Sequence, residues 1–184
     1  MNRTWIFILL FISLLISSCH QKQGEIITKR IQYDVNIKSP DPNYDWWIQN
    51  LVGPQRERLV SLLLTGAKEG KYQAYDYYFQ PISKAEVSKI LNDSVLRKIK
   101  QSTPPYGLID TLVVEKIGIK DIWKLRFLEE WKLNPENFTI NKKVLGIAPI
   151  AKRYDQLGIE RWQPLFWIFP DAAILKQIKR ESQP

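Results

Sequence analysis

Residues 144–149, Val-Leu-Gly-Ile-Ala-Pro, and residues 163–170, Gln-Pro-Leu-Phe-Trp-Ile-Phe-Pro, form the apolar centre of this sequence. Both segments are rich in β-branched or aromatic residues, both end at a proline, and a charged loop joins them. This pattern predicts a pair of buried strands, most simply a hairpin. One face of the pair should pack on the domain's own core, and the other should be covered by a helix or by a partner protein. The first face carries Leu165, Trp167 and Phe169, and the second carries Phe166 and Ile168.

Helix signals lie on both sides of this centre. Pro54 suits the first turn of a helix that runs to about Thr65. Ser83 and Glu86 have the spacing of a capping box, in which each side chain satisfies the other residue's free backbone N–H. Asp171 can cap a final helix. The apolar residues expected to face inward are Leu59, Leu62 and Leu63 in the first helix, Val87, Ile90 and Leu91 in the second, and Ile174, Leu175 and Ile178 in the third.

Strand signals cluster in the second half of the chain. Residues 112–115 are aliphatic, and apolar and basic residues alternate over 123–127, which predicts two further strands, the second ending at 129–131. Residues 134–137, Asn-Pro-Glu-Asn, predict a turn. Strands that cluster late, with helices before and after them, predict an α+β fold: a single domain with a mainly antiparallel sheet flanked by helices.

The first 18 residues have the pattern of a signal peptide. Arg3 supplies a positive charge, and an apolar run follows from Trp5 to Ile16, interrupted only by Ser13. As a helix this run would extend about 18 Å, which is short of the roughly 30 Å hydrocarbon core of a bilayer. A cleaved signal is therefore favoured over a membrane span.

Cys19 directly follows Ile-Ser-Ser, which resembles a bacterial lipobox. In such a motif the cysteine thiol carries the lipid, so Cys19 is the predicted lipidation site and the lipid bilayer a predicted partner. The alternative is an ordinary secretory signal that happens to contain a cysteine. Cys19 is the only cysteine in the chain, which rules out a disulfide within it.

The domain boundaries follow from composition. Residues 19–43 are polar, contain two prolines and show no clear periodicity, so they predict a flexible tether between the membrane and a domain over 44–184. Residues 20–23 contain no acidic cluster. By resemblance to lipoprotein sorting signals, this favours a lipid anchor in the outer membrane, with the domain facing the periplasm.

Residue types that carry catalysis are scarce. His20 is the only histidine and lies in the predicted tether, so Ser-His or Cys-His machinery is not expected. Glu129 and Glu130 are neighbours on a predicted strand and should point to opposite faces, so they cannot serve together as acid and base. We expect no enzyme activity, no cofactor, no metal site and no nucleic-acid binding. The net charge of +8 could suit anionic lipid, lipopolysaccharide or an acidic protein, or could simply be dispersed over the surface.

Aromatic residues are the candidates for binding, because aromatic side chains are enriched at protein interfaces. The predicted partner-binding residues are Trp46, Trp47, Trp131, Trp162 and Trp167. An alternative function, binding of cell-wall glycan, rests on the tyrosine-rich segment 72–79. In that alternative, Tyr75 and Tyr78 would be contact residues.

The C-terminal half resembles the GldN/PorN family of gliding motility and type IX secretion proteins. The resemblance rests on Glu-Glu-Trp at 129–131, Lys-Lys-Val-Leu-Gly-Ile-Ala-Pro at 142–149, and Gln-Pro-Leu-Phe-Trp-Ile-Phe-Pro at 163–170, in that order. A weaker match covers 62–91. The resemblance implies a periplasmic structural component that assembles into a secretion or motility complex, as a homo- or hetero-oligomer, and not an enzyme. The chain differs from the family in carrying its own lipobox and in lacking an extended C-terminal region.

Overall fold

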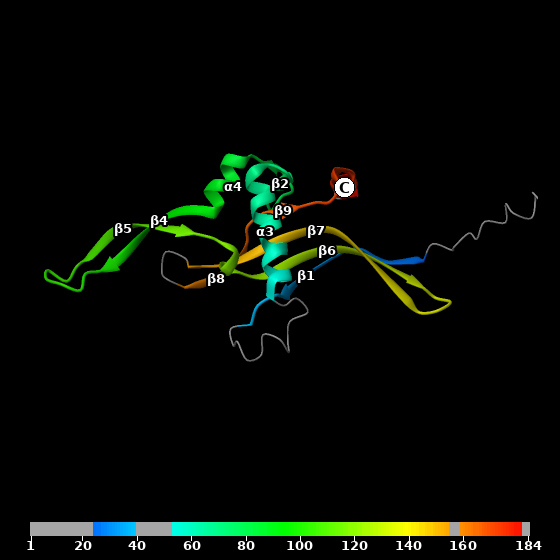
Figure 1. The fold of residues 1–184 in the computed structure, drawn as a ribbon, viewed down its shortest axis with the longest axis horizontal. Coiled ribbons are helices and arrows are strands. Elements are labelled where there is room, and N and C mark those ends of the chain that lie inside the picture. Colours follow the sequence, from blue (N-terminus) through cyan, green and yellow to red (C-terminus); the bar gives the residue numbers. More distant parts are fainter. Residues whose placement is uncertain (1–23, 40–52, 155–158, 182–184) are drawn as a thin grey trace, which may run out of the picture.

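The computed structural model describes residues 24–39, 53–154 and 159–181. These residues form an elongated molecule built on one long sheet (Figure 1). The sheet has seven strands in the order β1-β6-β7-β9-β2-β3, with β8 also paired to β7, and all their pairings are antiparallel. Together with its helices, this confirms the predicted α+β class with a mainly antiparallel sheet. The strands are β1 (Glu25–Asn36), β2 (Ala74–Tyr75), β3 (Pro81–Ile82), β6 (Ile122–Asn134), β7 (Thr139–Tyr154), β8 (Glu160–Pro164) and β9 (Trp167–Ile168).

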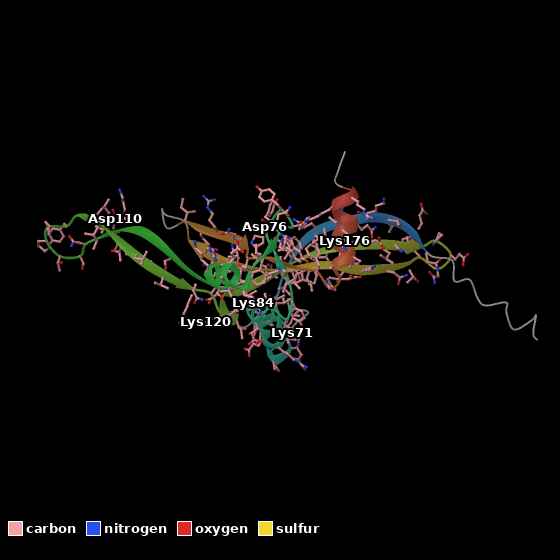
Figure 2. The ribbon with its side chains drawn as sticks, turned by 90° about the horizontal axis from the view of Figure 1, so that it is seen from above. Lys71, Asp76, Lys84, Asp110, Lys120 and Lys176 are labelled. Atoms are coloured by element: carbon pink, nitrogen blue, oxygen red, sulfur yellow. The ribbon has the colours of Figure 1, made fainter. Side chains whose placement is uncertain are left out.

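Helices cover both faces of the sheet. Figure 2 shows Lys176 of α5 (Ala172–Glu181) on one side and Lys71, which follows α3 (Gly53–Glu69), on the other. The short helix α4 (Lys84–Leu91) packs with α3. It begins with the predicted capping box, in which Ser83 N donates to Glu86 Oε2 at 2.6 Å and Glu86 N donates to Ser83 Oγ at 3.2 Å. Asp171 accepts a hydrogen bond from Ala173 N at 2.8 Å, as predicted for the start of α5.

The core is divided into two clusters by the sheet. The first cluster lies under α3 and α4 and includes Val60, Leu63, Leu64, Val87 and Leu91. The second lies under α5 and includes Leu145, Ala148, Ile174, Leu175 and Ile178. The inward faces of α4 and α5 are as predicted, but Leu62 of α3 is 44% exposed, because Val60, Leu63, Leu64 and Ala67 form the buried side of that helix.

The apolar centre of the sequence is divided between the two clusters. Strand β7 runs on to Tyr154, and its residues 150–154 pair with 160–164 of β8. The two segments predicted to form a hairpin, 144–149 and 163–170, meet directly where Ile168 of β9 pairs with Ile147 of β7. Leu165, Phe166 and Ile168 belong to the α3 and α4 cluster, and Trp167 and Phe169 belong to the α5 cluster. Both faces are therefore covered by helices of the chain itself, and Leu165 lies on the face opposite to the predicted one.

Strand β1 corrects the middle of the flexible tether predicted over 19–43, and residues 19–23 and 40–43 of that segment lie outside the described residues. Glu25–Asn36 is a 12-residue edge strand that pairs with β6 along most of its length. Arg126 of β6 holds Asp34 of β1 through two hydrogen bonds, from Nε at 2.6 Å and from Nη2 at 3.0 Å. These bonds raise the pKa of the Arg126 guanidinium. The folded domain thus begins at β1 and not at residue 44.

Two hairpins project from the body at opposite ends (Figure 1). One is formed by β6 and β7, which meet at the turn predicted for 134–137, so β6 runs past the predicted end at 129–131. The other is formed by β4 (Asn92–Lys100) and β5 (Leu108–Lys116), a separate two-stranded sheet. A one-turn helix, η1 (Ile119–Asp121), connects β5 to β6.

Candidate functional site

The hairpin of β4 and β5, here called the arm (Asn92–Lys116), projects from the body and carries several exposed side chains. Its strands pair with each other from Asn92↔Lys116 to Lys100↔Leu108, and within the described ranges no other strand joins them. Apolar side chains on the arm are exposed at Ile99, Leu108, Ile109, Leu112 and Val114. An isolated two-stranded ribbon is marginally stable in water, and unpaired strand edges readily accept another strand. The arm therefore has the properties of a surface for protein contacts.

The base of the arm is fixed to the body. Ile117, which follows β5, is 9% exposed and belongs to the core cluster under α3 and α4. Its backbone N–H donates to Leu91 O at 2.8 Å, and Arg153 of β7 donates to Ile90 O. Because the base is packed and hydrogen-bonded while the outer part is exposed, the arm is held at a defined position on the body.

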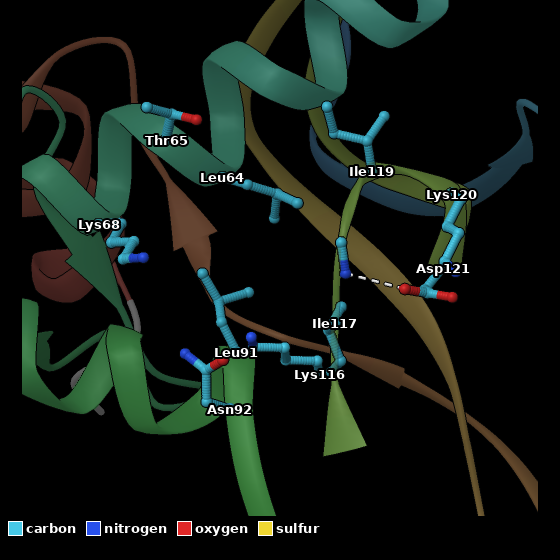
Figure 3. Close-up of a pocket in the computed structure, with 11 residues that line it drawn as sticks. Leu64, Thr65, Lys68, Leu91, Asn92, Lys116, Ile117, Ile119, Lys120 and Asp121 are labelled. Carbon is cyan, nitrogen blue, oxygen red and sulfur yellow. Dashed lines mark hydrogen bonds between the residues drawn. The ribbon is translucent and has the colours of Figure 1, made fainter. Parts of the chain in front are cut away.

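A cavity of about 480 Å³ opens at this base, between α3, the start of β4 and η1 (Figure 3). Its apolar side is formed by Leu64, Leu91, Ile117 and Ile119, and its rim carries Lys68, Lys116 and Lys120. Asp121 is the acidic residue of the lining, and its carboxylate accepts a hydrogen bond from Gly118 N at 2.8 Å. An apolar hollow with a basic rim is suited to an apolar side chain of a partner segment that also carries acidic residues.

The predicted tryptophan sites do not form one surface. Cys19, Trp46 and Trp47 lie outside the described residues. Trp167 is 2% exposed beneath α5, so it is a core residue and the prediction that it binds a partner is wrong. Trp131 and Trp162 lie on different strands near opposite ends of the sheet, where Trp131 pairs with Lys142 and Trp162 pairs with Lys152.

Trp131 takes part in a local polar cluster. Its indole N–H donates to Glu129 Oε2 at 2.8 Å, and Lys142 Nζ lies 4.2 Å from the centre of its ring. Glu129 is buried, with 5% exposure, and also accepts a hydrogen bond from Tyr33. Burial and this hydrogen bond raise the pKa of the Tyr33 phenol. Glu130, in contrast, forms an ion pair with Lys132 at 3.4 Å, so the two neighbouring carboxylates contact different side chains.

The tyrosine-rich segment is divided between core and surface. Tyr75 is 8% exposed and packs edge-on against Phe169 at 5.3 Å, so it cannot be the glycan-contacting residue that the alternative function requires. Tyr77 and Tyr78 are 67% and 77% exposed on a turn in which Asp76 Oδ1 accepts from Tyr78 N and Gln80 N. Only this second pair is available for binding.

Trp162 has a neighbour that was predicted only as a strand residue. Trp162 is 38% exposed, and the ring of Trp123 meets it at 6.0 Å and 67°. These two residues line a cavity of about 350 Å³ with Lys38, Lys124, Lys152, Glu160 and Asn36. The one local signal was the alternation of Trp123 with Lys124, which placed it on a strand but did not reveal its contact with β8.

The side chains within the described ranges supply no group of three or more His, Cys, Asp or Glu residues that could hold a metal ion. Across the same ranges, no helix is both long enough and apolar enough to cross a bilayer. What the described part does offer is a projecting ribbon, a basic-rimmed cavity and an aromatic pocket. These features define an α+β domain with three candidate binding surfaces.

A family model supplies the identification. The model described as gliding motility associated protein GldN matches residues 23–177, which is most of the chain and includes every strand of the structure. The chain belongs to the GldN family, as the resemblance of its three C-terminal motifs indicated. A search of curated proteins finds no match to it.

Proposed function

We propose that this protein is a lipid-anchored, periplasm-facing structural component of the gliding motility and type IX secretion apparatus, without catalytic activity of its own. Cys19 would carry the lipid and hold the domain at the outer membrane, where the arm would contact a second protein of the complex. The observation that carries the proposal is membership of a gliding motility family combined with a ribbon of exposed apolar strands. The cell-wall glycan alternative loses one of its two named residues, since Tyr75 is buried.

The arm is favoured as the contact surface because it exposes apolar side chains and strand edges that a partner could cover. Leu108, Leu112 and Val114 are each more than 60% exposed, and their burial in an interface would be favourable by about 25 cal/mol for every Å² removed from water. The free edges of β4 and β5 can add a partner strand through backbone hydrogen bonds. The basic rim of the adjoining cavity would then select a partner segment that carries acidic side chains.

The lipid anchor contributes through local concentration. A domain held at a membrane by acyl chains meets membrane-bound partners at a much higher effective concentration than a free domain does. Even a weak contact through the arm would then suffice for assembly. The proposed role requires both the lipid on Cys19 and the arm. A variant that lacks either one should therefore assemble less well.

The test is a pull-down in mild detergent of the tagged protein at its native expression level, with mass spectrometry of the co-purified proteins. Leu112→Lys should remove most of the co-purified motility or secretion proteins, and Cys19→Ala should reduce them. Ile140→Lys is the matched control, because Ile140 is an exposed apolar strand residue (42%) on the hairpin at the opposite end. Equal recovery with Leu112→Lys and Ile140→Lys would exclude the arm, and absence of fatty-acid labelling at Cys19 would exclude the anchor.

A further inference from the structure

The cavity lined by Trp123 and Trp162 is built mainly by residues of four strands, β1, β6, β7 and β8. Register places Asn36 opposite Lys124, Lys124 opposite Ile150, and Lys152 opposite Trp162. Because Ile150 and Lys152 are two residues apart on β7, all of these side chains share one face of the sheet. Apart from Lys38, which follows β1, the residues that line the cavity are therefore positioned by strand pairing.

A β-bulge brings Trp123 to this face. Ile122 pairs with Ala151 and Lys124 pairs with Ile150, so two steps along β6 correspond to one step along β7, and Trp123 is the extra residue. In a regular strand Trp123 would point away from Lys124. Bulges re-aim single side chains in this way and are common beside functional sites. Here the bulge places the ring of Trp123 in a T-shaped contact with the ring of Trp162.

A lysine ammonium group lies over each of the two indole rings. Lys38 Nζ lies 4.7 Å from the centre of the Trp123 ring, and Lys124 Nζ lies 4.6 Å from the centre of the Trp162 ring. These contacts hold the ammonium groups at the cavity wall, where they can meet an anionic group of a ligand. Trp162 remains 38% exposed, so part of its ring surface is free for a flat, weakly polar ligand.

The remaining lining indicates a ligand with hydroxyl groups. Glu160 lies in the cavity wall, with its Oε2 2.6 Å from Lys152 Nζ, and the Asn36 amide adds both donors and an acceptor. The Glu160 carboxylate, already paired with Lys152, can accept hydrogen bonds from hydroxyl groups, which a sugar offers at several positions and the acidic side chains of a peptide do not. Indole rings stack well on the C–H face of a pyranose, and a volume of about 350 Å³ lies within the usual range for small-ligand pockets.

A second cavity adjoins the first and resembles it in charge, but it has no aromatic residue. It has a volume of about 270 Å³, shares Lys38 with the aromatic cavity, and adds Arg56, Lys120 and a single acidic residue, Glu57. Two adjoining hollows, each with several cations and one carboxylate, would fit successive units of a polymer. From the bulged tryptophan, the paired cations and the neighbouring hollow, we infer that this end of the sheet binds an acidic polysaccharide, with one sugar unit on Trp162 and its carboxylate or phosphate on Lys124 or Lys38.

The aromatic cavity shares no lining residue with the cavity at the base of the arm, whereas the second cavity shares Ile119 and Lys120 with it. The variants that separate this inference from the assembly role of the arm therefore lie in the aromatic cavity. The acidic sugar could come from the cell wall or from the carbohydrate of lipopolysaccharide. The pocket recognises what the two share, a pyranose ring with an anionic substituent. In this inference glycan is bound by Trp162 and the lysines beside it, and not by the tyrosine-rich segment 72–79.

The test measures binding of the whole soluble domain, from Gln23 to Pro184, by tryptophan fluorescence and calorimetry. The probes are oligogalacturonate, a neutral malto-oligosaccharide of equal length and poly-glutamate. Oligogalacturonate should bind, and its affinity should fall about tenfold in Trp162→Ala and severalfold in Lys124→Gln. Lys142→Gln is the matched control, because Lys142 makes the same kind of cation–π contact with Trp131 at 4.2 Å outside this cavity.

Each outcome decides the inference. Equal loss in Lys124→Gln and Lys142→Gln, or equal binding of the neutral sugar, would overturn it. Tighter binding of poly-glutamate would show instead that the face binds acidic protein. Muropeptides from digested cell wall and delipidated lipopolysaccharide carbohydrate then identify the source, and failure of both to bind would also overturn the inference. Since the arm is intact in these variants, their partner pull-down should not change.

Discussion

A β-carbon placed on Gly146 would lie 2.8 Å from Cε1 of Phe169. The same β-carbon would lie 3.3 Å from Cε3 of Trp167, so β7 approaches the aromatic residues at and after β9 as closely as a glycine permits. The Phe169 ring has little room to move, because Tyr75, Phe79 and Trp167 surround it at centre distances of 5.3 to 6.0 Å. This contact gives a physical reason for the glycine in the Gly-Ile-Ala-Pro motif.

Gly146→Ala should therefore destabilise the domain. The added methyl group must displace a ring that is itself packed, and such overpacking costs about 1 to 3 kcal/mol of unfolding free energy. Gly107→Ala is the control, because a β-carbon there meets no atom within 4 Å and the residue lies in the loop of the arm. Urea denaturation followed by circular dichroism measures both. A Gly146→Ala protein as stable as the Gly107→Ala protein would show that the ring yields without cost.

The edge strand β1 predicts the effect of a shortened chain. If residues 19–43 were a tether, a protein beginning at Pro40 would be as stable as one beginning at Gln23. The structure predicts the opposite, because removing β1 exposes the edge of β6 and removes the stacking of Tyr33 on Phe127 and the ion pair of Asp34 with Arg126. We expect the shorter protein to lose cooperative unfolding or to aggregate. Size-exclusion chromatography and thermal melts of the two proteins measure the difference.

The raised pKa of Tyr33 leads us to expect that the unfolding free energy falls at high pH. Its pKa is raised above the ordinary value of 10.0 by burial and by its hydrogen bond to Glu129, so the folded state holds the phenolic proton more tightly than the unfolded state. The stabilisation is complete below pH 10.0 and is lost as the pH rises through the higher folded-state pKa. Tyr33→Phe should remove this part of the alkaline loss, and at neutral pH it should cost about 1 kcal/mol or less, because buried Glu129 loses one donor but keeps its hydrogen bond from Trp131. Parallel alkaline slopes in the two proteins would contradict the assignment.

The capping box of α4 predicts an effect at low pH. Hydrogen bonds from the backbone and hydroxyl of Ser83 lower the pKa of Glu86 below its ordinary value of 4.5. The contribution of Glu86 is therefore present above pH 4.5 and is lost as the pH falls through the lower folded-state value. Glu86→Gln should flatten this acid dependence. Ser83→Ala should cost about 1 kcal/mol at neutral pH, as removal of a helix N-cap does. Stability curves between neutral and acidic pH, measured by urea denaturation, test both variants.

The elements that could be predicted from the sequence are those whose signals are local. The capping box of Ser83 and Glu86, the turn at 134–137 and the cap at Asp171 each depend on residues within three or four positions of one another. The apolar run at 163–170 could be recognised as core for the same reason. The sequence could not show how residues 163–170 are divided between the two faces of the sheet, because this division depends on which helix packs on each face.

The elements that were missed depend on distant partners. In β1 the residues Ile31, Tyr33 and Val35 alternate with polar ones, but this strand exists because it pairs with β6, some 90 residues later in the chain. The aromatic cavity was missed in the same way. Trp123 reaches Trp162 only through a register shift between β6 and β7, which no local pattern in either strand reports.

Because the arm projects from the body, we expect that it can be shortened without loss of stability but with loss of partner binding. Ser94 and Val114 are paired residues, so the outer part of the arm can be replaced by a two-residue Asn-Gly turn that joins them and favours a tight hairpin. The removed segment has exposed side chains at Ile99, Leu108, Ile109 and Leu112, so its loss should change the unfolding free energy by less than about 1 kcal/mol. Ile117→Ala, which truncates a core residue at the base of the arm, should instead cost about 2 to 5 kcal/mol. If the arm is the contact surface, the shortened protein will melt like the native one yet recover no motility or secretion proteins in the pull-down. A shortened protein that unfolds early would show that the arm supports the fold, and one that recovers the same partners would place the contact elsewhere.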